Sequence, residues 1–437
     1  MAEHSLQAMS AGGIFDHIGG GFSRYSTDEK WLVPHFEKML YDNALLILAC
    51  LEAFQLTQNR RYADAARRTA DYILRELADP RGGFCCGQDA DSDGVEGKYY
   101  LFTPEEVKRV LGEADGARFC QMYDITATGN FEGKSIPNRI GKSGPGWDGG
   151  DPRLLRLLEY RKSRTRLHLD RKVLLSWNGW TIMALAAAGG ILGDSRYLNA
   201  AVRAQAFIQT AMTDETGRLY HRFCDGEAAH GGQLGDYAAY TLALVELYGR
   251  TFDTGYLREA VRCAKGMLEL FEDRDGGGFY MTAHDASPLI ARPKETYDGA
   301  IPSGNSAAAM ALERLAGLTG DPLFREAADR QLAFLAGRIG DYPAGYCYAL
   351  LAMSRVLYPR RELLCTGAHI PDELISYVRA RPAHDLSILY KSRENETELA
   401  ELAPFTKAYP ASDEPVFYLC ENGACRRPER EFKRLGL

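Results

Sequence analysis

The most regular feature of the sequence is a repeated pair of segments, the first apolar and the second amphipathic. The first segments open with Asn43, Asn178, Tyr237 and Asn305. In all four cases an aromatic residue 19 positions later begins the second segment, and alanine stands four positions after that aromatic residue. A pattern that recurs at a fixed spacing is typical of a fold built from repeated supersecondary units. We therefore expect the chain to be built from such units.

Each unit of the repeat predicts a helical hairpin. The apolar segments, such as 44–56 and 238–248, predict inner helices, and the amphipathic segments, such as 62–77 and 256–271, predict outer helices. Turn-forming residues separate the two, with Asp at or near the start of several outer helices, where its side chain can cap the helix. Further helical stretches at 104–111, 151–167 and 344–357 supply the remaining hairpins.

Three of the predicted outer helices run into similar glycine-containing loops, at 79–84, 214–220 and 273–280. A single hairpin cannot bury its apolar face, so neighbouring hairpins have to stack, and a ring closes the stack. The predicted fold is therefore all-α, an (α/α)6 toroid over residues 1–358, with an open solenoid as the alternative. From residue 359 to residue 437 short apolar runs alternate with a helical segment, which predicts a small α/β C-terminal element.

Composition and charge exclude several classes of partner. The chain has 437 residues, a net charge of −7 and a pI of about 5.8. An acidic surface without basic blocks argues against nucleic acid, and no apolar run is long enough to predict a membrane span. The first ten residues lack a basic and then apolar leader, so we expect a cytoplasmic protein. The scattered cysteines predict neither a disulfide framework nor a zinc site, and we expect no metal and no cofactor.

Two cysteine pairs stand apart from the others because of their short spacing. Cys85 and Cys86 are adjacent, and Cys420 and Cys425 lie close together near the end of the chain. Either pair could be redox-active. Burial as small apolar side chains is the better interpretation of both.

Candidate chemistry gathers in the loops that lead into the inner helices, because in a toroid these loops meet at one mouth. Asp16 and His17 lie in a glycine-rich loop at 12–22, where structural and functional roles are equally plausible. His35 and Glu37 precede the first inner helix, and a histidine beside a carboxylate can transfer protons to or from a sugar. The alternative is a capped helix start with a restrained histidine.

The acidic segment 89–97 resembles a calcium loop but has Tyr100 where that loop needs its closing acid. Asp91 and Glu96 instead form a candidate acid and base pair across a glycosidic bond. The catalytic candidates are thus His35, Glu37, His17, Asp16, Asp91 and Glu96. The substrate-binding candidates supply aromatic faces, amides and charges near the inner helices, and they are Tyr41, Asp42, Asn43, Asp89, Trp177, Asn178, Asp236, Tyr237, Arg292, Lys294, Glu295, Asp298 and Asn305.

Several of these segments together resemble a known family, and they follow one another in order along most of the chain. They read GGIFDHIGGGF, PHFEKMLYDN, DADSDGVEGKYY, SWNG, RPKETYDGAIPSGN and, near the end, CENGACRRP. The chain resembles the thioredoxin-domain-containing family of the bacterial YyaL-like proteins and their spermatogenesis-associated relatives. This resemblance implies a six-hairpin toroid similar to N-acylglucosamine 2-epimerases and related glycosidases. It also implies a separate thioredoxin-like domain, which we expect to be absent from this chain and to be a possible partner.

These observations predict a carbohydrate-active protein that binds a sugar in the toroid mouth. The reaction would be that of an epimerase or isomerase, or of a glycoside hydrolase, by His and carboxylate acid–base chemistry. One alternative is a non-catalytic module that binds a sugar or a partner, because Gly235 stands where the resemblance leads us to expect an acid. A second alternative is a redox-associated role through Cys420 and Cys425.

Overall fold

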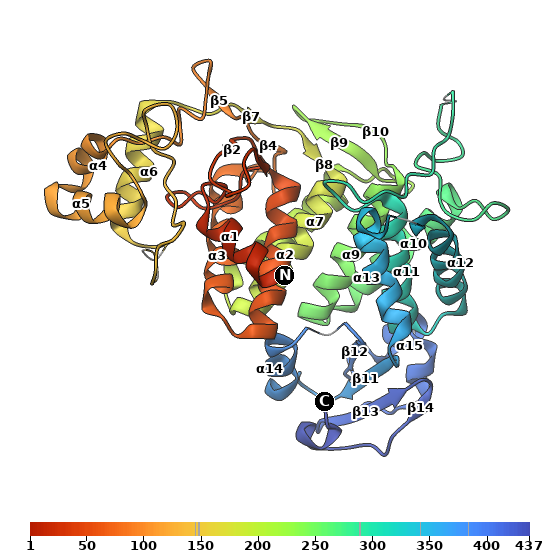
Figure 1. Cartoon of the computed structure of the whole chain (residues 1–437). Helices are drawn as coiled ribbons and strands as arrows, with labels where there is room; N and C mark the ends of the chain where they lie inside the picture. The colour runs from red at the N-terminus through yellow and green to blue at the C-terminus, as the bar shows by residue number, and fades with distance from the viewer. Residues whose placement is uncertain (145, 147–148, 288–289, 341, 383) are drawn as a thin grey trace. The chain divides into compact units, whose positions relative to one another are not determined.

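The structure is a computed structural model that describes residues 1–144, 146, 149–287, 290–340, 342–382 and 384–437 (Figure 1). The chain divides into two compact units, Met1–Val173 and Leu174–Leu437. The boundary predicted at residue 358 lies within the second unit, between a helix that ends at Leu357 and a strand that begins at Arg361. The division into a toroid and a C-terminal element stays a prediction.

The first unit consists of helices joined by loops and very short strands. Its helices are α1 (Ala2–Ala11), α2 (Leu40–Thr57), α3 (Arg60–Tyr72), a π-helical turn (Ile73–Leu77), α4 (Pro104–Leu111), α5 (Glu113–Met122) and α6 (Pro152–Arg164). Its strands are β1 (Tyr25–Ser26), β2 (Pro34–His35), β3 (Lys38–Met39), β4 (Gly87–Gln88), β5 (Asp91–Ser92), β6 (Val95–Glu96) and β7 (Leu169–Asp170), with β8 (Val173–Leu174) at the boundary. Strand β1 pairs with β2, β3 with β4 and β7, and β5 with β6, all antiparallel.

The second unit contains three long hairpins and then a small sheet. Its helices are α7 (Leu175–Leu192), α8 (Ser195–Ala211), α9 (Leu234–Thr251), α10 (Thr254–Phe271), α11 (Gly304–Thr319), α12 (Pro322–Ile339), α13 (Cys347–Leu357), α14 (Asp372–Ala380) and α15 (Glu396–Leu402). Its strands are β9 (Tyr220–Cys224), β10 (Glu227–Gly231), β11 (Arg361–Thr366), β12 (Leu386–Lys391), β13 (Val416–Glu421) and β14 (Ala424–Cys425). Short 3₁₀ turns cover Pro343–Tyr346, Pro404–Ala408 and Phe432–Leu435.

The predicted hairpins are confirmed, and the same local chemistry joins the helices in each. Every inner helix ends on a left-handed residue, which is Gln58, Gly193, Phe252 or Gly320. A capping side chain follows at once and accepts a hydrogen bond from the backbone of the outer helix. The caps are Asn59, Asp194, Asp253 and Asp321. A left-handed C-cap followed by an N-cap stops one helix and starts the next within two residues.

The predicted roles of inner and outer helices are also confirmed within the second unit. Helix α9 packs on both α7 and α11, and each of these three also packs on its own outer helix. Helix α9 is buried all round from Leu234 to Tyr248, whereas α10 buries one face. The predicted fold class is confirmed: this is the all-α hairpin architecture of the (α/α)6 toroid class, with a small sheet portion.

The three predicted glycine loops share one geometry. Each closes a short antiparallel bridge, Ala78 with Phe84, Thr213 with Leu219, and Glu272 with Phe279. Gly82, Gly217, Gly277 and Gly278 have positive φ in these loops, which explains why glycine recurs there. The loops therefore turn the chain from the end of an outer helix toward the next inner helix.

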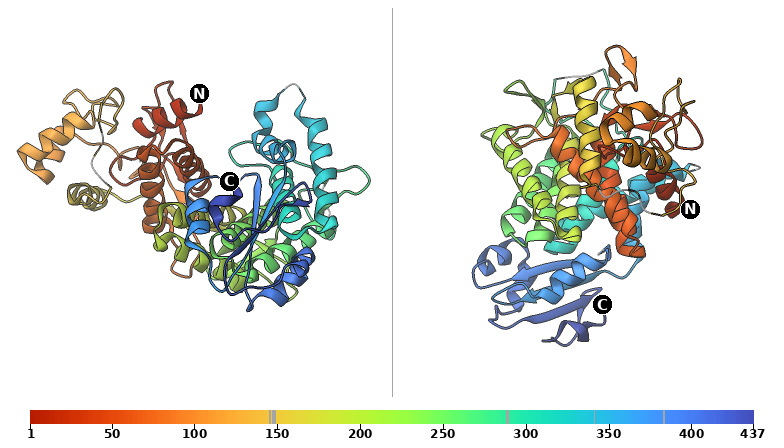
Figure 2. Two further views of the ribbon diagram at one scale, coloured as in Figure 1. Left: turned by 90° about the horizontal axis from the view of Figure 1, so that it is seen from below. Right: turned by 90° about the vertical axis from the view of Figure 1, so that its left-hand side faces the viewer.

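The C-terminal part of the second unit is an α/β element, as the sequence predicted. Its sheet has the order β12-β11-β13-β14, with β11 parallel to β12 and antiparallel to β13 (Figure 2). Leu363, Cys365 and Leu389 are buried in it. The parallel pair is joined through α14, as parallel strands require a crossover.

Helix α2 alone among the described helices has the length and apolar composition that would allow it to cross a membrane. Leu40, Ala44, Ile47 and Leu51 on this helix are buried within the first unit, where α2 packs against α3. Its apolar composition therefore fits the inner helix of a hairpin.

Candidate functional site

The segment from Pro34 to Leu40 places its side chains alternately on two sides. Phe36 and Lys38 are buried, whereas His35 and Glu37 are partly exposed. Such alternation follows from extended backbone, in which successive side chains point in opposite directions. The segment thus presents His35 and Glu37 together on one side, directly before α2.

Carboxylates flank the imidazole of His35. Its Nδ1 lies 2.7 Å from Oε1 of Glu96, and its Nε2 lies 3.7 Å from Oε2 of Glu37. The ring stacks on Tyr25, with a centroid distance of 5.1 Å. The side chain of His35 keeps 28% of its surface exposed. The imidazole is therefore held in place by Glu96 and Tyr25 and remains within reach of a ligand.

The β5–β6 hairpin brings Glu96 to His35. Asp93 and Gly94 form its turn with positive φ at both residues, and Asp91 pairs with Glu96 across the strands. Gly97 follows with a φ of 73°, and a Cβ there would lie 2.5 Å from the ring of Phe36. Only glycine fits so close to that ring, which lets the hairpin approach the segment that carries His35.

The cluster continues from Glu37 toward the first turn of α2. Arg24 Nη1 lies 3.1 Å from Oε2 of Glu37 and also interacts with the hydroxyl of Tyr41. Oδ2 of Asp42 is buried and has no hydrogen-bond partner among the described residues. Burial raises the pKa of Asp42 to about 7, although Arg24 opposes the shift. Asp42 is thus a carboxyl group that is about half protonated at pH 7. We name Arg24, Tyr25, His35, Glu37, Tyr41, Asp42 and Glu96 the His35 cluster.

Asp16 and His17 lie in the interior instead. Asp16 accepts hydrogen bonds from Lys38 at 2.9 Å and from Arg161 at 2.8 Å, and all three side chains are buried. Burial alone would raise the pKa of Asp16, but Arg161 and Lys38 hold it well below its usual value. Burial and Arg68 lower the pKa of His17 to about 3. Its Nε2 lies 3.0 Å from the carbonyl oxygen of Gly12. These contacts favour the structural interpretation of both residues.

The amides at the start of the inner helices bind backbone groups. Asn43 Oδ1 accepts from Phe22 N at 2.7 Å, and its amide nitrogen donates to Phe22 O and Met39 O. Asn305 makes the same three kinds of contact, with Phe279 N, Phe279 O and Glu295 O. Asn178 donates to Leu174 O, and all three amides are fully buried. These asparagines join a preceding loop to each helix.

In the second unit Asp236 and His221 form a close pair. Asp236 Oδ2 lies 2.7 Å from Nδ1 of His221 and accepts from Gln233 N at 2.8 Å, while Oδ1 accepts from Ser176 N at 2.9 Å. The carboxylate is buried, but the side chain of His221 is 29% exposed. The hydrogen bond to Asp236 raises the pKa of His221. Trp177 is half-buried in the first turn of α7, next to Ser176.

The remaining candidates mostly support loops. Lys294 lies 2.5 Å from Asp273, and Arg292 lies over the ring of Tyr280, 4.1 Å from its centroid. Asp298 accepts from the backbone nitrogens of Tyr348 and Ala349 at the start of α13. Tyr237 is buried and its hydroxyl accepts from Leu219 N, whereas Glu295, Asp89 and Asp91 are exposed.

Sequence analysis missed Arg24, Tyr25 and His221. Arg24 and Tyr25 are far from any helix start, and the pairing of β1 with β2 brings Tyr25 opposite His35. His221 is a lone histidine on β9, and nothing beside it in the sequence indicates a partner. Its partner Asp236 belongs to the capping box that Gln233 and Asp236 form at the start of α9. That capping box was the only signal that the sequence offered. No group of three or more His, Cys, Asp or Glu side chains arranged to hold a metal ion occurs in the described part of the chain.

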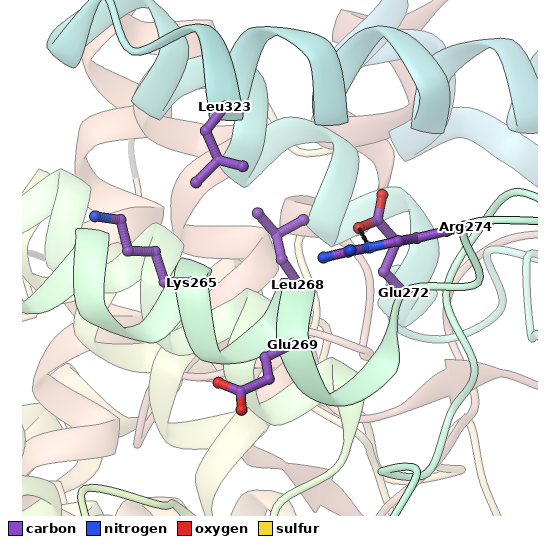
Figure 3. Close-up of a pocket in the computed structure, with 6 residues that line it drawn as sticks. All are labelled: Lys265, Leu268, Glu269, Glu272, Arg274 and Leu323. Carbon is purple, nitrogen blue, oxygen red and sulfur yellow. Dashed lines mark ion pairs between the residues drawn. The ribbon is translucent and has the colours of Figure 1, made fainter.

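A groove of about 390 Å³ lies between α10 and α12 (Figure 3). Leu268 and Leu323 contribute its apolar walls, while Lys265, Glu269, Glu272 and Arg274 surround them. None of these residues belongs to the His35 cluster or to the Asp236 pair. The groove is therefore separate from both groups of side chains.

This architecture defines the chain as a helical-hairpin protein of the toroid class. No family model matches the chain. The chain is 31% identical to human spermatogenesis-associated protein 20 over 478 aligned residues, which cover 98% of this chain and 61% of the relative. An uncharacterized protein from Caenorhabditis elegans is 27% identical, over 100% of this chain and 65% of its own length. The predicted resemblance to the spermatogenesis-associated proteins is confirmed, and the chain spans about three fifths of their length.

Solved structures of similar fold include enzymes that act on sugars. A sugar epimerase from a ruminal bacterium has a TM-score of 0.49 at 13% identity, covering 78% of this chain and 72% of the other. A GH76 α-mannanase from Bacteroides thetaiotaomicron has a TM-score of 0.47 at 13% identity, covering 87% and 81%. A cellobiose 2-epimerase from Bacillus thermoamylovorans has a TM-score of 0.43 at 10% identity, covering 78% and 67%.

Proposed function

We propose that this chain binds a carbohydrate at the His35 cluster and transfers protons on it, in the manner of a sugar epimerase or isomerase. The observation that carries the proposal is the imidazole of His35, oriented by Glu96 at Nδ1 and left partly exposed. A histidine fixed in this way by a carboxylate can act as a general base near neutral pH.

The His35 cluster also contains a proton donor. A substantial fraction of Asp42 is protonated near neutral pH because burial raises its pKa to about 7. Epimerisation next to a carbonyl group needs a base that removes a proton from carbon and an acid that protonates the carbonyl oxygen. His35 serves as the base and Asp42 as the acid in our proposal, and Glu37 and Arg24 are placed to bind hydroxyl groups.

Exposed aromatic surface supports a sugar as the substrate. Tyr25 is 50% exposed and stacks on His35, so its other face is available to a pyranose ring. Tyrosine faces commonly pack on the apolar faces of sugars, while charged and amide groups bind the hydroxyls. Hydrolysis by a carboxylate pair is the less favoured reaction, since Asp91 is exposed and Glu96 is already paired with His35.

The experiment is NMR of deuterium exchange with a panel of mono- and disaccharides in D₂O. We expect exchange at the carbon next to the anomeric centre with at least one sugar. His35→Ala should lower this rate by about 100-fold or more, because a general base is lost. The matched control is His4→Ala, since His4 is an exposed histidine on α1. Absence of both exchange and binding for every sugar would overturn the proposal.

A non-catalytic binding module is the alternative, and one observation favours it. Asn43, Asn178 and Asn305, which sequence analysis assigned to substrate, are buried and bonded to backbone, so they offer a ligand little. Sugar binding without exchange, unchanged in His35→Ala and Glu37→Ala, would favour this alternative. A thioredoxin-like partner and a cytoplasmic location stay predictions.

A further inference from the structure

The hairpin of β13 and β14 carries a disulfide bridge close to its turn. Cys420 and Cys425 face each other across the two strands and are joined through their Sγ atoms. Cys425 is exposed and Cys420 is partly exposed, at the edge of the C-terminal sheet (Figure 1). The bridge is therefore within reach of a thiol in solution.

The hairpin has other means of keeping its shape. Asn422 and Gly423 form the turn with φ of 50° and 79°, which is the Asn-Gly turn that two-residue hairpins favour. Beyond the bridge the backbone pairing continues, because Arg426 N donates to Leu419 O and Phe417 pairs with Glu429. A bridge that closes a short loop constrains the unfolded chain less than one that closes a long loop. The turn and the backbone pairing therefore hold the hairpin in addition to the bridge.

A hydroxyl group lies against one of the two sulfur atoms. The oxygen of Tyr409 is 2.9 Å from Sγ of Cys425 and 3.8 Å from Sγ of Cys420, so its O–H donates mainly to Cys425. Lys391 holds the carbonyl oxygen of Tyr409 at 2.7 Å, and the ring of Tyr409 packs against Tyr418. The hydroxyl is thus positioned beside the sulfur that would leave as a thiolate.

The other cysteines differ in surroundings. Cys50, Cys85, Cys120, Cys263 and Cys365 are buried thiols outside any disulfide. Burial raises the pKa of Cys50 to about 12 and that of Cys85 to about 11. A thiol that does not ionise is a poor nucleophile, so these cysteines are protected from exchange. The Cys420–Cys425 bridge combines exposure with a hydrogen-bond donor at one sulfur.

We propose that the Cys420–Cys425 bridge is a thiol–disulfide exchange site that accepts two electrons from an external dithiol, with Cys420 attacked first. The thiolate of the dithiol forms a bond to Sγ of Cys420, and the bond between Cys420 and Cys425 breaks. The electron pair goes to Sγ of Cys425, which the Tyr409 O–H stabilises. The second thiol of the dithiol then loses its proton and attacks the mixed disulfide. Cys420 leaves as a thiolate, and both cysteine thiolates take up protons.

The first experiment identifies the sulfur that is attacked. The exposed Cys347 and the partly exposed Cys224 are blocked with N-ethylmaleimide, and the folded protein is then treated with glutathione. Peptide mass spectrometry locates the adduct after the newly freed thiols are trapped with iodoacetamide. We expect glutathione on Cys420 and iodoacetamide on Cys425. An adduct mainly on Cys425, or no adduct on either residue in the folded protein, would overturn the proposal.

The second experiment tests Tyr409 with a dithiol. Reduction of the bridge by dithiothreitol is timed in the protein and in Tyr409→Phe, which keeps the ring but loses the hydroxyl. We expect about fivefold slower reduction in the variant, the factor that corresponds to one lost hydrogen bond. Tyr418→Phe is the matched control and should reduce at the original rate. Equal rates for both variants would contradict the role of Tyr409, and circular dichroism checks that each remains folded.

Discussion

Two aspartates occupy the same place at the start of their helices and have opposite surroundings. Asp42 is the third residue of α2, and Asp236 is the third residue of α9. Asp236 receives two backbone N–H groups and the imidazole of His221. Oδ2 of Asp42 is buried without a partner among the described residues. Both aspartates have the same position in their helices. The difference in their hydrogen-bond partners therefore comes from the loops that pack against each helix start.

The comparison separates a carboxylate whose oxygens accept hydrogen bonds from the fold from one whose Oδ2 has no such partner among the described residues. Around Asp236 the β9–β10 hairpin supplies His221 and the capping box supplies Gln233. Both carboxylate oxygens of Asp236 therefore have hydrogen-bond partners. Around Asp42 the neighbours are Arg24 and Glu37, whose charges oppose each other. A buried carboxyl without donors is costly to ionise, so it keeps its proton and can donate it. We infer that helix position alone does not decide the role of an acid.

The largest expected effect is the loss of stability in Asp236→Ala. This change leaves the partly buried N–H groups of Ser176 and Gln233 without acceptors and removes the partner of His221, which should lower the free energy of unfolding by about 3 kcal/mol. Asp42→Ala is the matched variant and should not lower the free energy of unfolding, because Oδ2 of Asp42 accepts no hydrogen bond from the described residues and burial disfavours its ionised form. Urea denaturation at pH 7 measures both. Equal losses would show that the two acids are equivalent.

The second prediction concerns pH and Asp42. The folded-state pKa of about 7 exceeds the usual 3.8, so between pH 4 and pH 7 the folded state holds a proton that the unfolded state has lost. The contribution of Asp42 to stability therefore falls as pH rises through this range and is constant above it. Asp42→Asn removes the dependence. Subtracting its unfolding curves from those of the original protein at each pH isolates the effect, and a flat difference would contradict it.

His221 should titrate in a different range. The hydrogen bond to Asp236 raises its pKa above 6.5, so its stabilising contribution is complete below pH 6.5 and is lost as pH rises through the folded-state pKa. We expect His221→Gln to cost about 1 kcal/mol at pH 6 and progressively less in alkaline solution. The double variant with Asp236→Asn should show that the two losses are not additive. Additive losses would mean that the pair does not act together.

The smallest expected effect on stability is that of Glu96→Gln. The side chain of Glu96 is 48% exposed, and such exposed ion pairs contribute about 0.5 kcal/mol. The rate of sugar exchange should nevertheless fall by about tenfold, because His35 loses the group that orients it. A change that leaves stability intact and lowers the rate distinguishes positioning from folding. Unaltered exchange would show that Glu96 does not orient a base.

The hairpins were predictable because their signals are local. A left-handed residue is followed directly by a capping aspartate at Gly193 and Asp194, and again at Gly320 and Asp321. The glycine ends the inner helix, and the aspartate accepts a hydrogen bond from a backbone N–H within two residues of it. The outer helix predicted to Leu77 ends as an α-helix at Tyr72 and continues as a π-helical turn. Apolar spacing does not distinguish these two kinds of turn.

The candidate site was only partly predictable because its contacts join distant segments. His35 and Glu37 were recognisable as neighbours in the sequence, but the contact of His35 with Glu96 depends on the β5–β6 hairpin. The pairing of Asp16 with Arg161 spans most of the first unit, so nothing near Asp16 in sequence indicated a buried ion pair. Residue type suggested the chemistry, and the fold decided which groups remain accessible.

The most direct test of the central claim is carbon-13 NMR of the Asp42 carboxyl group, assigned by comparison with Asp42→Asn. We expect this carboxyl to titrate near pH 7 and its resonance to shift when a sugar from the panel is added at saturating concentration. A titration near pH 4 together with no response to any sugar would contradict the account.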